Sequence, residues 1–504
     1  MSAWKDHVTA ALIGMESGGS QATPALPAEL DGALAVATST LSPEAAFLTR
    51  AGAMAWWRRA GYRPPVSAEP PPLPCSPDTA PLVSDTSSGH LRLMLGGFHA
   101  EVLPEWLGEV ARYGRLITPE LLPPLLEWVR TAKAERPLVL AAGGARVRWL
   151  AACHPAWDFA AAADPTHWET GSREQRVSIL RGWRAADPLK GLEKLVEVWA
   201  SEPADMRTAF LAVLETGLGP ADEPFLERAL DDRSKEVRQA AANLLARLPG
   251  SAFVARMVAR ANPILIYKRG GLLRKASLEI ALPEPPDAAG TRDGLDPKKA
   301  SGTGRAFGEK ANLLAQIFGA VPPSHWTTIC REEPATLVAA VRKHNFARAV
   351  LTGWSRAAWR HRDAAWAAAL LETSADLQAP PDLVPPGVLL GVLSEEARVR
   401  RLAAGIRGGT LGKSEDWQEL HQLVWSFQPH LPVPVAQDLL HALRALATKP
   451  LPWHLQNLLK TVALKVPPKL LPFALDNWPE PNHAAALVDA MHFRREALTA
   501  LTQS

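Results

Sequence analysis

The residues of this chain that could do chemistry are scattered, and none falls into a spacing that specifies a reaction. Gly302, Gly304 and Gly308 suggest a phosphate-binding loop, but Glu309 and Lys310 follow where a Walker loop needs Lys and then Ser or Thr. The fourteen histidines include no pair spaced around a glutamate to place two zinc ligands on one helical face. We therefore predict no catalytic residue, no cofactor and no metal ligand, and expect the protein not to be an enzyme.

The stretch from Arg342 to Arg362 carries an excess of positive charge. It contains no acidic residue, and the first acid after it is Asp363. Its basic residues are Arg342, Lys343, Arg348, Arg356, Arg360 and Arg362. Three of them share a helical face, and Trp354 and Trp359 are interleaved, so the stretch could follow a phosphate backbone and stack on bases. The alternative is a solvated helix face whose tryptophans point inward. The apolar stripe of Trp354, Ala358 and Ala365 favours this alternative.

A second set of charged residues recurs at an interval of 31 residues in the middle of the chain. The arginines of this set are Arg176, Arg207 and Arg238, and an acid precedes each by two positions: Glu174, Asp205 and Glu236. Like charges on successive layers would repel each other unless acids lay between them. We therefore predict a ladder in which these acids pair with the arginines of their own or the next unit, with about 0 to 1 kcal/mol from each exposed pair.

The apolar residues keep the same interval and predict helices. From Val237 to Leu248 they recur with the period of one helical stripe, and Ser172 and Ser234 are candidate N-caps. The stretch from Asp222 to Leu230 reads as a short helix that is unstable alone. Two antiparallel helices in each unit would bury each other's stripes and leave one side for the next pair. The predicted fold is all-α, an α-solenoid with irregular ends and one long loop insertion.

Composition sets broad limits on the protein class. The chain has 504 residues, 47% of them hydrophobic and 21% charged, with a net charge of +3, so bulk charge does not demand nucleic acid. Three widely separated cysteines indicate a reducing cytoplasm. The apolar run from Val8 to Met15 is too short to cross a bilayer, and we expect no membrane contact. Eighteen tryptophans are interpreted as wedges between irregular helices.

Six segments are expected along the chain. These are an N-terminal helical arm (1–62), a Pro-rich linker (63–88), degenerate helical repeats (89–170), regular 31-residue repeats (171–262), a loop insertion with a short strand (263–308) and irregular helical repeats (309–504). Because long irregular loops are often functional, the insertion is predicted to be a mobile contact surface.

Residues 231–252, DDRSKEVRQAAANLLARLPGSA, resemble a HEAT-type repeat, with Val237, Arg238 and Ala241 in the positions of its second helix. The strings RWLAACHPAW, GPADEPFLERAL, VPPSHW and MHFRREAL make the wider chain similar to a bacterial family of uncharacterised HEAT-like proteins. That resemblance implies a gene neighbourhood encoding MoxR-type AAA ATPases, von Willebrand A domain proteins and SWIM zinc-finger proteins, and it offers no catalytic residues.

From these observations we expect a cytoplasmic, non-catalytic scaffold or adaptor for protein–protein interaction. The resemblance implies a MoxR-type AAA ATPase or a SWIM zinc-finger protein as its partner. The alternative is a nucleic-acid-binding protein that uses the basic stretch 342–362.

Overall fold

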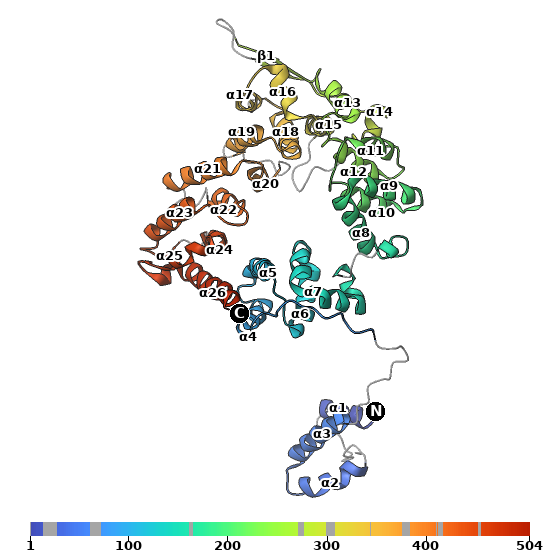
Figure 1. Ribbon diagram of the computed structural model, residues 1–504, viewed down its shortest axis with the longest axis vertical. Coiled ribbons are helices and arrows are strands. Elements are labelled where there is room, and N and C mark those ends of the chain that lie inside the picture. Colours follow the sequence, from blue (N-terminus) through green and yellow to red (C-terminus); the bar gives the residue numbers. More distant parts are fainter. Residues whose placement is uncertain are drawn as a thin grey trace. The chain divides into compact units, whose positions relative to one another are not determined.

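The computed structural model describes residues 2–13, 28–60, 72–160, 165–270, 277–298, 308–342, 344–374, 384–409, 411, 417–451 and 455–503. This described part is mostly helical and holds one two-stranded sheet, so the predicted all-α class is confirmed (Figure 1). Contacts divide the chain into two compact units, Met1–Pro74 and Cys75–Ser504.

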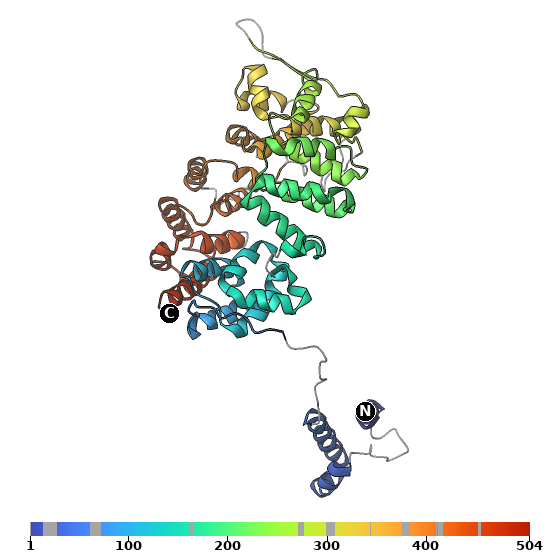
Figure 2. The ribbon, with the colours of Figure 1, turned by 45° about the vertical axis from the view of Figure 1, so that its right-hand side comes forward.

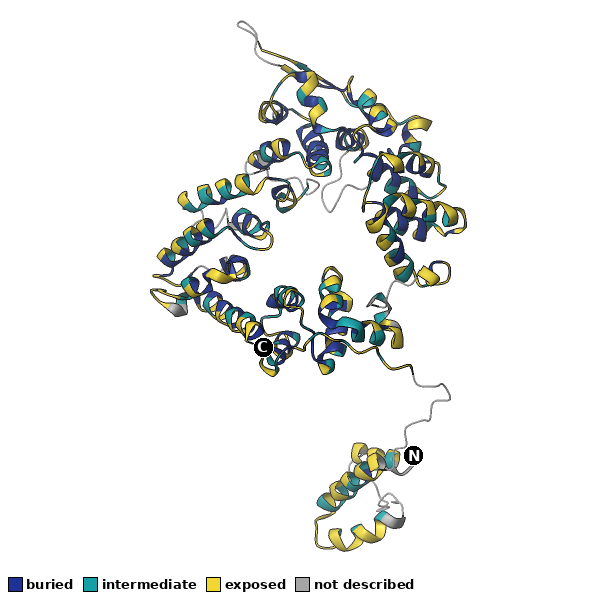
Figure 3. Ribbon diagram, in the orientation of Figure 1, coloured by how far each residue is buried: buried dark blue, intermediate teal, exposed yellow. Residues whose placement is uncertain are grey.

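The first unit contains the predicted helical arm, which consists of α1 (Ser2–Ile13), α2 (Ala28–Thr38) and α3 (Pro43–Ala60). Helices α1 and α2 pack on α3. His7 is buried and stacks on Phe47, and Arg50 of α3 pairs with Asp31 of α2 at 2.5 Å. Among the described residues of this unit, Met54 is the one large apolar side chain that is fully buried. Few of its described residues are therefore buried (Figure 3).

The second unit begins inside the segment predicted to be a linker. Its first helices are α4 (Asp85–Leu95), α5 (Leu103–Arg112), α6 (Leu122–Thr131) and α7 (Arg136–Cys153). The prediction of a linker over 63–88 is wrong at its end, because Ser84 caps α4 and the Val83 amide donates to the Leu116 carbonyl at 2.8 Å. Val83 is buried among the first helices, and this burial offsets the unfavourable composition around it.

Six helices carry the 31-residue repeat. They are α8 (Arg173–Ala186), α9 (Pro188–Val198), α10 (Ala204–Val213), α11 (Glu223–Ala229), α12 (Lys235–Leu245) and α13 (Ala252–Ala261). Helices α8, α10 and α12 begin 31 residues apart, and each packs on the next. Their partners α9 and α11 pack on α8 and α12. Ser172 and Ser234 are N-caps as predicted, and Ser172 forms a capping box with Gln175.

The insertion that follows holds more regular structure than the sequence indicates. Strand β1 (Leu265–Lys268) pairs antiparallel with β2 (Ser277–Ile280), so Leu265 lies opposite Ile280. A short helix, α14 (Ala288–Arg292), follows. One short strand was predicted near Leu278. Its partner β1 was not predicted. A strand of four residues shows too few alternations of apolar and polar side chains to be distinguished from the end of a helix.

Twelve α-helices complete the described part of the chain. They are α15 (Glu309–Ala320), α16 (Pro323–Cys330), α17 (Pro334–Val341), α18 (Ala347–His361), α19 (Ala364–Ser374), α20 (Pro386–Leu390), α21 (Glu395–Arg407), α22 (Trp417–Trp425), α23 (Val433–Leu446), α24 (Gln456–Lys465), α25 (Leu471–Leu475) and α26 (Ala485–Thr502). Helices α18 and α19 are separate, because Arg362 takes a left-handed conformation (φ 50°) at the end of α18 and Asp363 caps α19.

These helices form two rows within the second unit. Helices α18, α20, α22, α24 and α26 pack on one another in order, while α21 packs on α23 beside them. The row ends where it meets the beginning of the unit, since α26 packs on α4 and α5 (Figures 1 and 2). Phe493, Ala497 and Leu501 of α26 belong to the same buried cluster as Leu91 of α4 and Trp106 of α5.

A buried ion pair joins α5 to α26. Arg494 has no exposed side-chain surface, and its Nε lies 2.5 Å from Oε2 of Glu105. The same guanidinium donates to the carbonyls of Ala463 and Val466 at the end of α24, and His430 lies 2.9 Å from the other Glu105 oxygen. Burial raises the pKa of Glu105, but hydrogen bonds from Arg494 and His430 outweigh it and lower the pKa overall.

Candidate functional site

The arginines of the 31-residue repeat form one chain of contacts across three layers. Arg176 of α8 forms an ion pair with Glu202, which stands just before α10. Arg207 of α10 donates to the Glu202 carbonyl at 2.7 Å and to Oδ1 of Asp232 at 3.0 Å. Arg238 of α12 donates to the Asp232 carbonyl at 2.7 Å. The turns before α10 and α12 therefore lie between successive arginines.

The predicted acid partners of these arginines are wrong. Asp205 pairs with Arg173 at 3.4 Å, and Glu236 accepts a hydrogen bond from the Ser234 hydroxyl. Glu174 lies in the first turn of α8, where a carboxylate complements the helix dipole. Helical side chains point back toward the N-terminus of their own helix, so each arginine reaches the turns rather than the acid of the next helix.

Burial also changes the expected energy of this arginine ladder. The side chains of Arg207 and Asp232 are 7% and 9% exposed, and those of Arg176 and Glu202 are 12% and 7% exposed. These are not the exposed pairs that the sequence suggested. Breaking such a buried pair by removing one partner costs about 3 to 5 kcal/mol.

Part of the described insertion, around Arg292 and Asp293, is tied to α11 and α13 by ion pairs. Asp293 is almost fully buried, and its carboxylate receives Arg256 at 2.7 Å and Arg260 at 2.6 Å, both from α13. Arg292 reaches back to Glu227 and Asp231 at the end of α11. The sequence signal for this network was weak, because its members are spread over some sixty residues.

The basic stretch is not an exposed face. Arg342, Arg348, Arg356 and Arg360 are half-buried, Arg362 is exposed, and Lys343 lies outside the described residues. Trp354 is fully buried between Trp326 and Trp366, so it cannot stack on a base. Trp359, at 47% exposure, remains available at the surface.

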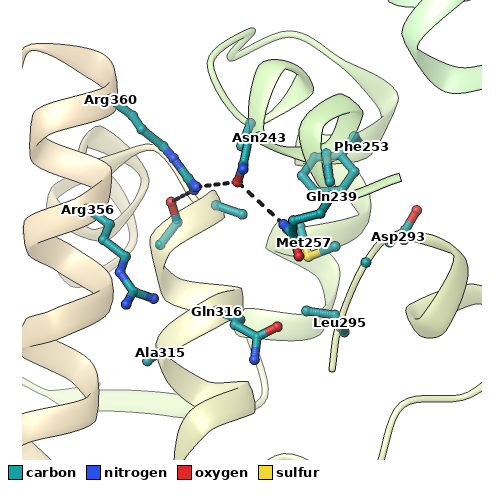
Figure 4. Close-up of a pocket in the computed structure, with 15 residues that line it drawn as sticks. Gln239, Asn243, Phe253, Met257, Asp293, Leu295, Ala315, Gln316, Arg356 and Arg360 are labelled. Atoms are coloured by element: carbon teal, nitrogen blue, oxygen red, sulfur yellow. Dashed lines mark hydrogen bonds between the residues drawn. The ribbon is translucent and has the colours of Figure 1, made fainter. Parts of the chain in front are cut away.

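Arg356 and Arg360 instead line a cavity between the regular repeats and the C-terminal helices. The cavity is small, with about 60 Å³ of space open to a molecule the size of water. Helix α12 contributes Gln239 and Asn243 to its wall, and α15 contributes Gln316 (Figure 4). Arg360 crosses from α18 to the opposite side of this cavity, where its guanidinium donates to Oδ1 of Asn243 at 2.9 Å.

The position of Arg360 has a structural reason and an electrostatic cost. It also donates to the Gly319 carbonyl at 2.6 Å, in the last turn of α15, where a carbonyl has no partner within its own helix. Desolvation, followed by the charges of Arg356 and Arg247, lowers the pKa of Arg360 to about 10. The side chain is thus a cation held by neutral acceptors beside two other cations.

Other candidate chemistry is limited in the described part of the chain. Gly302 and Gly304 lie outside it, and Gly308 is the N-cap of α15. Among the residues described, no three His, Cys, Asp or Glu side chains come together as a metal site requires. None of the described helices combines the length and apolar character needed to cross a bilayer.

A model of a family of unknown function, DUF5691, matches residues 6–501 of this chain. No curated protein and no solved structure matches it.

Proposed function

The chain belongs to a family of unknown function, DUF5691, and we propose that it is a non-catalytic adaptor that binds another protein through its first unit. The observation that carries this proposal is the exposed apolar surface of that unit. Leu12, Val36, Leu48 and Trp56 are between 69% and 83% exposed. Monomeric proteins rarely leave large apolar patches in water unless a partner covers them.

The geometry of the first unit also favours a partner. Leu48 and Trp56 lie two helical turns apart on α3, and Val8 and Leu12 lie one turn apart on α1. Their helices are held together mainly by small contacts around His7, Phe47 and Met54. A partner that packed against these exposed side chains would supply the apolar contacts that the unit does not make internally.

The second unit would act as the scaffold. We propose that its helices form a HEAT-like α-solenoid, supported by the 31-residue spacing of α8, α10 and α12 and by the ordered packing from α18 to α26. In such a stack each pair of helices covers the apolar side of the previous pair, which leaves a long surface for binding.

For the partner we propose a MoxR-type AAA ATPase or a SWIM zinc-finger protein of the cytoplasm. This proposal depends on the resemblance of the sequence to bacterial HEAT-like proteins and on the gene neighbourhood that it implies. The three free cysteines support a reducing compartment.

The test is direct binding by the purified full chain. Proteins captured on the immobilised chain would be identified by mass spectrometry, and each candidate would then be purified and its Kd measured. We compare the wild type with the double variant Leu48→Ser, Trp56→Ser. The matched control is Leu189→Ser on α9 of the second unit, a leucine that is 57% exposed.

We expect the double variant to weaken binding at least tenfold, about 1.4 kcal/mol, and the control to bind as the wild type does. Equal affinity of all three proteins, or no captured protein that binds the purified chain directly, would contradict the proposal. The nucleic-acid alternative is less well supported, because Trp354 is buried and Arg360 is bound to Gly319 and Asn243. It would require binding that weakens steeply with salt.

A further inference from the structure

One segment of the insertion contacts three helices of the second unit in the way that a bound peptide does. We call residues 287–298 the strap. It begins at the short helix α14, and Leu295 and Asp296 beyond that helix belong to no helix or strand. Helices α13 and α15 pack on each other directly, so the strap is not needed to join them. Its contacts with α12, α13 and α15 therefore need an explanation of their own.

Helix α15 binds the backbone of the strap. The side-chain amide of Gln316 donates to the Asp296 carbonyl at 2.8 Å, and its oxygen accepts from the Asp296 N–H at 3.1 Å. Nδ2 of Asn312 donates to the Pro297 carbonyl at 2.9 Å. An amide side chain has both donors and an acceptor, so Gln316 can hold the two backbone groups of one residue whatever its side chain. Main-chain hydrogen bonds of this kind give peptide-binding proteins their affinity.

The apolar part of the strap fits between α12 and α13. Leu295 is 7% exposed and lines the same small cavity as Phe253 and Met257 of α13 (Figure 4). Gly294 before it has a φ of 80°, and a Cβ added there would lie 3.5 Å from the Cβ of Ala242 on α12. Because glycine takes this backbone conformation without strain, the contact favours a glycine followed by a leucine.

The strap also brings acids to cations of the helices. Asp293 is almost fully buried and pairs with Arg256 and Arg260 of α13. Oδ2 of Asp296 lies 2.5 Å from Nζ of Lys235 at the start of α12. Within the described part of the chain, the carboxylates that pair with Arg260 and Lys235 all belong to the strap. The helices are therefore positively charged where the strap supplies its aspartates.

The contacts that hold the strap are ones that another peptide can replace. The side chains of Lys235 and Asp231, which pair with Asp296 and Arg292 of the strap, are each 61% exposed. Salt and water compete for pairs so close to the surface. Among residues 287–298, all of which the structure describes, Leu295 is the single buried large apolar side chain. The strap is thus held by one apolar anchor and by polar contacts.

We propose that these helices form a binding site for a peptide segment of a partner protein, and that the strap occupies the site as an internal competitor. The residues of this strap-binding face are Lys235, Ala242, Arg256, Arg260, Asn312 and Gln316. The partner segment carries the pattern aspartate, glycine, leucine, aspartate, because these are the side chains that the face accepts. The inference goes beyond the adaptor surface proposed for the first unit, since every residue of the face belongs to the second unit.

The probe is a fluorescent synthetic peptide with the sequence of residues 287–298, titrated into the full chain and followed by anisotropy. We compare the wild type with the double variant Asp293→Asn, Leu295→Ser, which weakens the strap and leaves the helices unchanged. A triple variant adds Gln316→Ala, which removes the contact with the peptide backbone. The matched control is Glu284→Gln, because Glu284 precedes the strap and pairs with exposed Lys310 at 3.3 Å.

We expect the double variant to bind the peptide at least about tenfold more tightly than the wild type, because the intact strap competes at a high effective concentration. Adding Gln316→Ala should weaken that binding at least about fivefold through the loss of two hydrogen bonds. Glu284→Gln should bind the peptide as the wild type does. A peptide that itself carries Asp293→Asn and Leu295→Ser should not bind.

Hydrogen exchange in the wild type keeps the test decisive if the double variant fails to fold. Peptide at about 10 mM exceeds the roughly millimolar effective concentration of a tethered segment. It should therefore displace the strap and speed exchange of the Asp296 amide, which then loses its bond to Gln316. Unchanged exchange of that amide would overturn the proposal. Equal peptide affinity of the wild type and the double variant, or equal binding of the altered and unaltered peptides, would overturn it as well.

Discussion

Replacing Arg207 by methionine tests whether the arginine ladder stabilises the repeats. Methionine has a similar length and keeps the apolar contact over Trp199, whose ring lies 5.8 Å from the guanidinium. The substitution removes the bond to Asp232, a carboxylate only 9% exposed, and the bond to the Glu202 carbonyl. It therefore isolates the loss of a buried charge pair from the loss of packing.

The expected magnitude follows from what remains around Asp232. Removing one partner of a buried pair costs about 3 to 5 kcal/mol. The Ser234 amide still donates to Oδ1 of Asp232 at 2.8 Å, so part of the desolvation cost is still compensated. We therefore expect a destabilisation at the lower end, about 3 kcal/mol.

The assay is urea unfolding followed by circular dichroism, with Asp232→Asn and the double variant completing a mutant cycle. The control is Arg181→Met, an exposed arginine of α8, which should change stability by less than about 0.5 kcal/mol. The pair should show a coupling energy of about 0.5 to 3 kcal/mol. If Arg207→Met matches the Arg181→Met control, or if the effects of the two single variants simply add, the ladder contributes no stability and our reasoning is refuted.

Three further predictions concern the rest of the second unit. Because the pKa of Glu105 is lowered below its ordinary value of 4.5 in the folded protein, its ion pair should stabilise fully above about pH 5 and progressively less as pH falls through the lowered pKa. Glu105→Gln should remove this pH dependence in acid unfolding experiments, and an unchanged acid transition would count against the pair. Burial raises the pKa of the Cys330 thiol to about 11, so at pH 8 iodoacetamide should label exposed Cys153 much faster than Cys330; equal rates by mass spectrometry would contradict this. Gly353→Ala should destabilise the protein by about 1 to 3 kcal/mol through its clash with Phe318, and a thermal transition like that of the wild type would show that α15 and α18 can separate at little cost.

Local signals made most helices predictable. Helices α8 and α12 begin directly after Ser172 and Ser234, the two serines predicted to cap them, since capping depends on a few adjacent residues. The short helices α16, α20 and α25 were not predicted. Each begins with or near a proline and is too short to show a helical period, so its apolar residues resemble those of a loop.

The candidate sites were predicted less well than the helices. Arg356 and Arg360 were expected to face solvent or nucleic acid, and they line a cavity instead. The spacing of residues on one helix indicates which of them share a face, but it does not indicate what that face meets. The decisive contact joins Arg360 to Asn243, 117 residues earlier in the chain.

The sequence by itself determined the helical class, the 31-residue interval and the N-caps at Ser172 and Ser234, because these depend on periodicity and on hydrogen bonds between near neighbours. Only the tertiary structure decided which acids meet the arginines, where the insertion packs, and that the last helix packs on α4 and α5. Glu105 and Arg494 are 389 residues apart. Such a contact results from the accumulated packing angles of every helix between them, and no local pattern in the chain records that sum.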